Sequence, residues 1–398
     1  MTAPSLTQDL AAAEKTPAGW EPYTEHTETV GSAVVRLPRP GATQNDLLIQ
    51  AGFDPNEWRI SGPVNTRKWM RYDQEWLYYY KFDVVGGESP ESVAVDVEEL
   101  VKRIRKRRAS ASKAARGMTG NDAWAFLMSD WQIGKREGED GTAQTVDRIL
   151  EAVDLAKLQI RGLRRAGRKM PHGVLLGMGD IVEGSCGFYP NQQFLIDQNR
   201  REQARTTRAL IAHCIDELGP LFDRLTVASV GGNHGENRTR SGDKVTDDGD
   251  NDDVAVFEAV AEAYVRAGEE HQFVIPDDEL SFALELGGVE VGVTHGHLFK
   301  RGATAQAKAH EWWKGQDFGM QPVRGCRVLL SAHFHHLSLV SYGARTHIQA
   351  PAMDPGSRWF RNVTGEDSPA GVLTMRFDAE EALGFDDLRV LTPRGIAS

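Results

Sequence analysis

The chain has 398 residues, 40% hydrophobic and 26% charged, a composition typical of a soluble globular protein with one large domain or two. No apolar run approaches the roughly 18 residues of a membrane helix, and no signal peptide is apparent, so we expect a cytoplasmic protein without a membrane partner. The three cysteines form no CxxC pair and indicate neither a disulfide framework nor a zinc ribbon, and the net charge of −11 argues against coating nucleic acid through overall charge.

The N-terminal hundred residues predict a disordered start and a small module. Residues 1–38 are polar and contain prolines, so we expect them to be poorly ordered. Within residues 39–100, "ATQNDLLIQAGFDPNEWRI" suggests two short helices and "EWLYYYKFDVVGG" a strand. This α+β module could be winged-helix-like and bind nucleic acid. The alternative is an appendage that only packs.

A strongly basic stretch, "VKRIRKRRASASKAARG" at 101–117, follows this module. We interpret residues 101–119 as a basic linker to the main body. Blocks of like charge are often nucleic-acid-binding arms, and they are as often the solvated face of a helix or linker. The stretch makes DNA a candidate partner and leaves the second interpretation open.

Residues 120–398 alternate apolar strands with amphipathic helices and form the predicted catalytic domain. The runs "AWAFLMSD", "GVLLGMGD" and "RLTVASVGGN" are separated by long helical patterns, which is typical of parallel strands joined by helices. Shorter strands follow, interrupted by one clear helix around "ATAQAKAHEWWKG". The pattern predicts an α/β sandwich of two packed sheets flanked by helices.

Five apolar runs of this domain end in side chains that can bind a metal ion. The carboxyl ends of strands in open α/β sheets meet at one edge, so these side chains could converge. Each alone has an ordinary explanation as a turn, a helix cap or a packed histidine, whereas their recurrence after strand upon strand indicates a metal site. The candidate ligands are Asp130, Gln132, Asp180, Asn233, His295, His333 and His335.

Carboxylate, amide and imidazole groups without a thiolate suit manganese, iron or zinc. Seven candidates exceed what one ion needs, so we expect two divalent ions bridged by one carboxylate, an arrangement that clamps a phosphate and activates water.

The order Asp…Gly-Asp…Gly-Asn-His-x-Glu…His-Gly-His…Ala-His-x-His closely resembles the motifs of the calcineurin-like metallophosphoesterase superfamily, over about residues 120–350. Three positions depart from the family pattern: Gln132 replaces a histidine, a glycine is inserted before Glu236, and Ala332 replaces a glycine. The overall sequence pattern, with "SDWQIGK" and "GNHGENR", also resembles phosphoesterases of bacterial viruses, which are related in kind to double-strand-break repair nucleases. The resemblance implies the two-sheet metallophosphoesterase sandwich.

The resemblance also implies the role of each motif residue. Asp130 and His335 would bind the first metal, and Asp180 would bridge both. The second metal would be held by Asn233, His295 and His333. The amide of Gln132 is a weaker ligand than imidazole, so the first site should bind loosely and favour Mn²⁺, with Mg²⁺, Fe²⁺ or Zn²⁺ as alternatives.

His234 resembles the family histidine that protonates the leaving group or stabilises the transition state. Residues expected beside the ligands or the phosphate are Glu183, Glu236, Arg238 and His297.

Three functions fit these observations. The basic run, the N-terminal module and the lack of an export signal favour a DNA nuclease, cutting from ends or internally. The first alternative is a phosphodiesterase or phosphatase acting on nucleotides or small molecules. The second is a catalytically weak DNA-binding protein on the same fold. A homodimer is compatible with a domain of this size, although no surface for it is evident.

Overall fold

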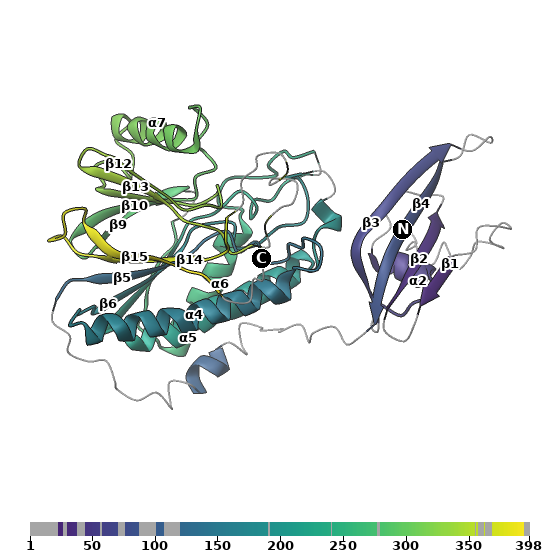
Figure 1. Ribbon diagram of the computed structural model, residues 1–398, viewed down its shortest axis with the longest axis horizontal. Helices are drawn as coiled ribbons and strands as arrows, with labels where there is room; N and C mark the ends of the chain where they lie inside the picture. The colour runs from purple at the N-terminus through teal and green to yellow at the C-terminus, as the bar shows by residue number, and fades with distance from the viewer. Residues whose placement is uncertain are drawn as a thin grey trace. The chain divides into compact units, whose positions relative to one another are not determined.

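The computed structural model describes residues 23–26, 30–37, 44–55, 58–70, 76–86, 101–106, 120–189, 192–239, 241–276, 279–354, 356, 362 and 368–393. The chain forms two compact units, Met1–Ser92 and Val93–Ser398. Each unit is described by itself, and Figure 1 labels their helices and strands.

The first unit is a four-stranded antiparallel sheet with one helix among its described residues. The strand order is β1-β2-β4-β3. Along β4, Tyr80, Phe82 and Val84 are buried while Lys81 and Asp83 are exposed, because successive side chains of a strand point to opposite faces. The elements are β1 (Tyr23–His26), β2 (Val30–Leu37), α2 (Gln44–Gln50), β3 (Trp58–Met70) and β4 (Trp76–Gly86).

Two expectations for this part of the chain are wrong. Strands β1 and β2 lie inside residues 1–38, which we expected to be poorly ordered. The second predicted helix is also absent from the described residues, since β3 begins at Trp58. Ala33 and Val35 of β2 are buried and their neighbours are not, so burial alternates with a period of two along this strand.

The start of the basic stretch belongs to the second unit rather than to a linker. Residues 101–106 form a helix. Val101 and Ile104, three residues apart on one face, are buried in the core of the second unit. Arg103 pairs with Asp216 of that unit at 3.0 Å. The rest of the predicted linker, 107–119, lies outside the described residues.

The second unit contains two sheets. The six-stranded sheet has the order β15-β14-β5-β6-β7-β8, with β5 to β8 parallel and β14 and β15 antiparallel to their neighbours. Its strands are β5 (Ala123–Met128), β6 (His172–Gly177), β7 (Arg224–Ser229), β8 (Gln272–Val274), β14 (Val372–Phe377) and β15 (Phe385–Leu391).

The five-stranded sheet has the order β12-β13-β11-β10-β9, in which β10, β11 and β13 are parallel. Its strands are β9 (Ser281–Leu286), β10 (Val289–Thr294), β11 (Val328–Ser331), β12 (Ser338–Tyr342) and β13 (Arg345–Gln349). The inner faces of the two sheets pack together through residues such as Leu127, Leu176, Val291 and Leu330, all fully buried.

Helices cover the outer faces of both sheets (Figure 1). The apolar stripe of α4, Ile149, Val153, Ala156 and Ile160, packs against the six-stranded sheet at the spacing of a helix face. Trp313 of α7 packs on the five-stranded sheet. The predicted two-sheet α/β sandwich flanked by helices is therefore confirmed. The helices are α4 (Thr142–Arg165), α5 (Arg200–Leu218), α6 (Asp252–Ala267) and α7 (Ala305–Phe318), with 3-10 turns at Gln192–Phe194 and Gly219–Leu221.

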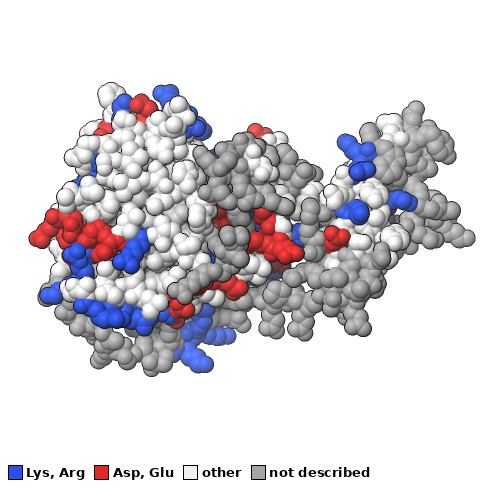
Figure 2. All heavy atoms as spheres, viewed as in Figure 1, with Lys and Arg blue, Asp and Glu red and all other residues white. Residues whose placement is uncertain are grey.

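One buried charge stabilises the edge of the six-stranded sheet. Arg376 of β14 is fully buried and donates to carboxylates that gather at the turn between β14 and β15, where Figure 2 shows an acidic group on the face in view. Its partners are Asp122, Asp378, Glu381 and Asp386. Within the described residues, no helix has the length and apolarity to cross a bilayer.

Candidate metal centre

The predicted ligands follow strands whose carboxyl ends meet at one edge of the two sheets. β5, β6 and β7 are parallel and in register, with Met128 opposite Gly177 and Gly177 opposite Ser229. Of seven described non-glycine residues with positive φ, five lie in the loops that leave these strands and β11, which is a concentration of backbone strain at one site. These five are Asp130, Gln132, Asp180, His333 and His335.

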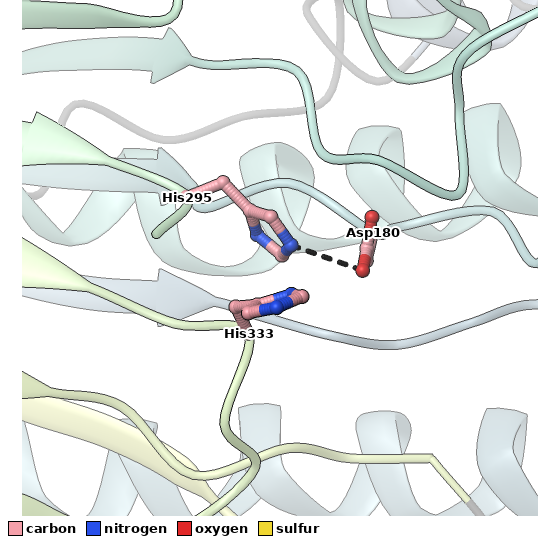
Figure 3. A group of neighbouring side chains, drawn as sticks. All are labelled: Asp180, His295 and His333. Carbon is pink, nitrogen blue, oxygen red and sulfur yellow. Dashed lines mark ion pairs between the residues drawn. The ribbon is translucent and has the colours of Figure 1, made fainter. Parts of the chain in front are cut away.

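Three of the predicted ligands meet at the position expected for the second metal. Asp180, His295 and His333 each offer one ligand atom, and these atoms lie within 4.8 Å of one another (Figure 3). His295 donates from Nδ1 to the backbone oxygen of Met178 at 2.8 Å. Its Nε2 therefore faces Asp180 Oδ2, 3.0 Å away. A carbonyl that fixes the tautomer in this way is typical of a metal-binding histidine.

Unpartnered buried atoms test whether the site suits an ion. Asn233 Oδ1 is buried without a hydrogen-bond partner, as are Asp130 Oδ1 and Glu183 Oε2, and His295 Nε2 faces only the Asp180 carboxylate. Buried polar atoms are normally paired, since each unpaired one costs about 1–3 kcal/mol. Burial lowers the pKa of His333 to about 4, which keeps that ring neutral and able to bind an ion. Burial also lowers the pKa of His295, but Asp180 raises it to about 9, so this ring would lose a proton when an ion binds. The donors fit a divalent ion.

Asp180 is held in place from two sides. Its Oδ1 accepts a hydrogen bond from the backbone N–H of His234 at 2.7 Å. Behind it, the carboxylate of Asp253 accepts from the backbone N–H groups of Asp180 and Gly232. Burial alone would raise the pKa of Asp180, but the imidazoles of His295 and His234 hold it below its usual range.

The first predicted metal position has a different environment. His335 lies between two carboxylates, with Nε2 3.3 Å from Asp130 Oδ1 and Nδ1 3.3 Å from Asp354 Oδ1. The Nζ of Lys135 donates to Gln132 Oε1 at 2.7 Å and also pairs with Asp354. Burial lowers the pKa of Lys135, but the nearby carboxylates raise it more, so the ammonium stays charged.

His234 lies beside the metal position with its proton held by Glu183. Its Nδ1 is 3.1 Å from both the backbone oxygen and the Oε2 of Glu183. Its ring stacks on Phe188 with 4.7 Å between the centroids. Burial lowers the pKa of His234, but Glu183 and Asp180 raise it to about 9, so the ring is an imidazolium at neutral pH.

The remaining candidates form a neighbouring group. Arg238 donates to Glu236 at 2.7 Å and lies over the ring of Phe188, 4.9 Å from its centroid. His297 Nε2 is 3.9 Å from Glu236 Oε1, and burial lowers the pKa of His297 to about 3. The Arg238 side chain is thus engaged by Glu236.

Several residues that shape the site were missed by the sequence reasoning. Asp253 lies in the acidic stretch at 243–253 and was not distinguished from its neighbours. Lys135 and Asp354 belong to no motif, and Phe188 and Tyr189 are in a loop. The tyrosine donates its hydroxyl to Glu183. Only Asp253 carries a sequence signal, because it opens a helix after Asn251, which caps it.

Comparisons with known proteins find similarity among solved structures. No protein-family model matches the chain, and no curated protein matches it. A predicted phosphoesterase from Streptococcus pneumoniae is 12% identical, with 69% of this chain and 91% of that one covered and a TM-score of 0.30. Zinc-bound Vps29 from Entamoeba histolytica is 12% identical, with 68% of this chain and 98% of that one covered and a TM-score of 0.28. An archaeal phosphodiesterase is 12% identical, with 67% of this chain and 99% of that one covered and a TM-score of 0.31.

The solved structures to which this chain is similar are thus calcineurin-like metallophosphoesterases, the kind of protein that the motifs resemble, at low sequence identity. At these TM-scores the similarity carries no argument about function, which rests on the geometry of the site.

Proposed function

We propose that this protein is a metal-dependent phosphoester hydrolase. The observation that carries the proposal is the convergence of metal-binding side chains beside a histidine that can donate a proton. Asp180, His295 and His333 lie together, Asn233 Oδ1 is buried without a hydrogen bond, and the backbone of His234 is anchored to Asp180. These four ligands would hold a divalent ion, for which Mn²⁺ remains our expectation. Whether a second ion joins it, as expected from the sequence, depends on the first position, where Lys135 lies.

The chain's own groups then have distinct tasks. A divalent ion at this place supplies Lewis acidity to a phosphoryl oxygen and to water. Glu183 holds Nδ1 of His234, so the other ring nitrogen, Nε2, is the one that can give its proton to the departing oxygen. Asp253 fixes the backbone of the loop that carries Asp180, so that the ligand carboxylate does not have to be ordered when substrate arrives.

Two classes of phosphoester substrate are considered, DNA and smaller phosphoesters. A DNA nuclease is supported by the basic stretch at 101–117. Within it, however, Val101 and Ile104 are buried and Arg103 is paired with Asp216. This part of the stretch is therefore engaged within the protein and less available to bind DNA. A phosphodiesterase or phosphatase for smaller substrates needs only the site itself. We therefore place small phosphoesters first and keep DNA binding and the homodimer as predictions.

Incubation of the manganese-loaded protein with bis-p-nitrophenyl phosphate, p-nitrophenyl phosphate and end-labelled single- and double-stranded DNA tests these functions. Turnover of a dye ester that Asp180→Asn abolishes would support the proposal. Cleavage of the DNA would establish the nuclease. Intact dye esters and intact DNA, with the ion bound, would contradict hydrolysis and favour the DNA-binding alternative.

A further inference from the structure

The Lys135 ammonium lies beside Gln132, one of the candidate ligands of the first of two expected metal ions. It donates to Gln132 Oε1 at 2.7 Å and pairs with Asp354, whose other oxygen faces His335 at 3.3 Å. Gln132 and His335 are two of the residues that the motifs assign to the first metal. The lysine therefore occupies the surroundings of that position with a fixed positive charge.

Gln132 is oriented by this lysine. An amide side chain has one oxygen, and here that oxygen accepts from Lys135. Its nitrogen faces the opposite way, 3.4 Å from His234 Nε2. Lys135 and the protonated ring of His234 both present donors to this amide, and its single oxygen is given to the closer one, Lys135. The only atom through which Gln132 could bind an ion is therefore already engaged.

Buried carboxylates and an ammonium of the protein lie together at the first position. The carboxylates of Asp130, Glu183 and Asp354 are all buried, and the Lys135 side chain is 13% exposed. A buried carboxylate needs a cation nearby, and a lysine ammonium is a compact point charge that can supply it. A divalent ion added here would be repelled at short range by the ammonium, with little water between them to screen the repulsion.

The second position contrasts with this arrangement. The groups whose charge acts on Asp180 are the imidazoles of His295, His234 and His333 rather than an ammonium, and Asn233 Oδ1 is buried without a hydrogen-bond partner. One position is thus prepared for an ion and the other already holds a cation of the protein.

We propose that the protein binds one divalent ion per chain, at Asp180, Asn233, His295 and His333, and that the Lys135 ammonium takes the place of the second ion. This inference rests on the proposed function for the ion bound at Asp180, and it changes the expected number of ions from two to one. The Gln132 oxygen is then a hydrogen-bond acceptor for Lys135 rather than a metal ligand.

Manganese stoichiometry of the full chain tests the inference without any activity assay. Metal-free protein is loaded with Mn²⁺, freed of excess, and measured by elemental analysis and electron paramagnetic resonance. We expect one ion per chain and the spectrum of an isolated ion. Two ions per chain with the spectrum of an exchange-coupled pair would overturn the inference and leave the proposed function intact. No bound ion would overturn both.

A double variant that removes the lysine should restore the second metal site. Replacing the ammonium and restoring the imidazole, Lys135→Met with Gln132→His, should raise the count to two and produce the coupled spectrum. Lys157→Met is the control, because Lys157 pairs with Glu217 on the helices and its loss should leave one ion. A double variant that keeps the native circular dichroism yet binds one ion would count against the inference. The wild-type count decides the question even if the double variant does not fold.

Discussion

The carboxylate of Asp253, at the start of α6, accepts a hydrogen bond of 2.8 Å from the backbone N–H of Asp180, at the end of β6. The same carboxylate accepts from the N–H groups of Ile181, Val182 and Gly232. One buried side chain thus holds the loop after β6 and the loop after β7 together. These loops carry Asp180 and Asn233, so the metal position depends on a residue that touches no metal.

Asp253→Asn should loosen this arrangement. The amide presents an NH₂ group to backbone N–H donors, and each donor left buried and unpaired costs about 1–3 kcal/mol. Two donors lose their acceptor, so we expect the free energy of unfolding to fall by about 2–6 kcal/mol and the affinity for Mn²⁺ to drop, as measured by urea denaturation and calorimetric titration. The neighbouring Asp252→Asn, which loses a surface pair with Arg200, is the control. Equal effects of the two substitutions would refute the role assigned to Asp253.

His234→Gln should remove the proton donor and leave the ion in place. General acid catalysis contributes about 10²–10⁴-fold, so we expect kcat for bis-p-nitrophenyl phosphate to fall by that order. The bound manganese, measured by elemental analysis, should stay at the wild-type value, since no ligand is altered. Glu183→Gln, which weakens the hold on Nδ1, should give a smaller loss. An unchanged kcat in His234→Gln would exclude this residue as the acid.

His172 makes stability depend on pH far from any predicted ligand. Its Nε2 is 2.8 Å from Thr226 Oγ1, and burial together with Arg224 lowers its pKa to about 4. At a pH between about 4 and 6.5, His172 is therefore protonated in the unfolded chain and neutral in the folded chain. Stability contributed by the neutral ring is complete above the unfolded pKa and is lost as pH falls below it.

From about pH 7.5 to about pH 5, this single group should cost about 2 kcal/mol of unfolding free energy. His347, whose pKa is also lowered to about 4 by burial, should add a similar loss. Denaturant unfolding at the two pH values measures the difference. In His172→Gln the difference should shrink, and a difference of wild-type size in this variant would show that His172 does not cause it.

Removal of the ion should destabilise the second unit. An ion present at about 100 times its dissociation constant adds about 2.7 kcal/mol to the native state, which is a shift of several degrees in Tm. We expect chelation to lower Tm and to abolish hydrolysis, with recovery of both on adding Mn²⁺. His295→Ala should have the low Tm with and without the ion. A Tm that chelation does not change would contradict a bound structural ion at these residues.

The sandwich was predictable from the sequence because apolar strands alternate with amphipathic helices, and the site because several strands end in side chains that can bind a metal. Asp180, His295 and His333 were predicted to converge from the ends of different strands, and they lie within 4.8 Å. Parallel strands in register bring their carboxyl ends to one edge, so the order of the motifs was enough. The ligand roles themselves remain predictions.

What the sequence did not show depends on side-chain direction and on contacts between distant segments. Lys135 and Asp354 are 219 residues apart, and neither has a spacing that marks it. Gln132 was assigned to a metal from its motif position, although the direction of its amide is determined by that lysine. In the first unit, β1 is too short and polar to be distinguished, and the valine-rich β2 was missed because it lies between polar, proline-containing segments.

The most direct test of the account is an anomalous difference map from crystals of the manganese-loaded protein. The account predicts one peak per chain, about 2.0–2.3 Å from an oxygen of Asp180, Asn233 Oδ1, His295 Nε2 and a ring nitrogen of His333, with Lys135 still bonded to Gln132. A map without a peak at these four side chains would contradict the metal centre on which the proposed hydrolysis depends.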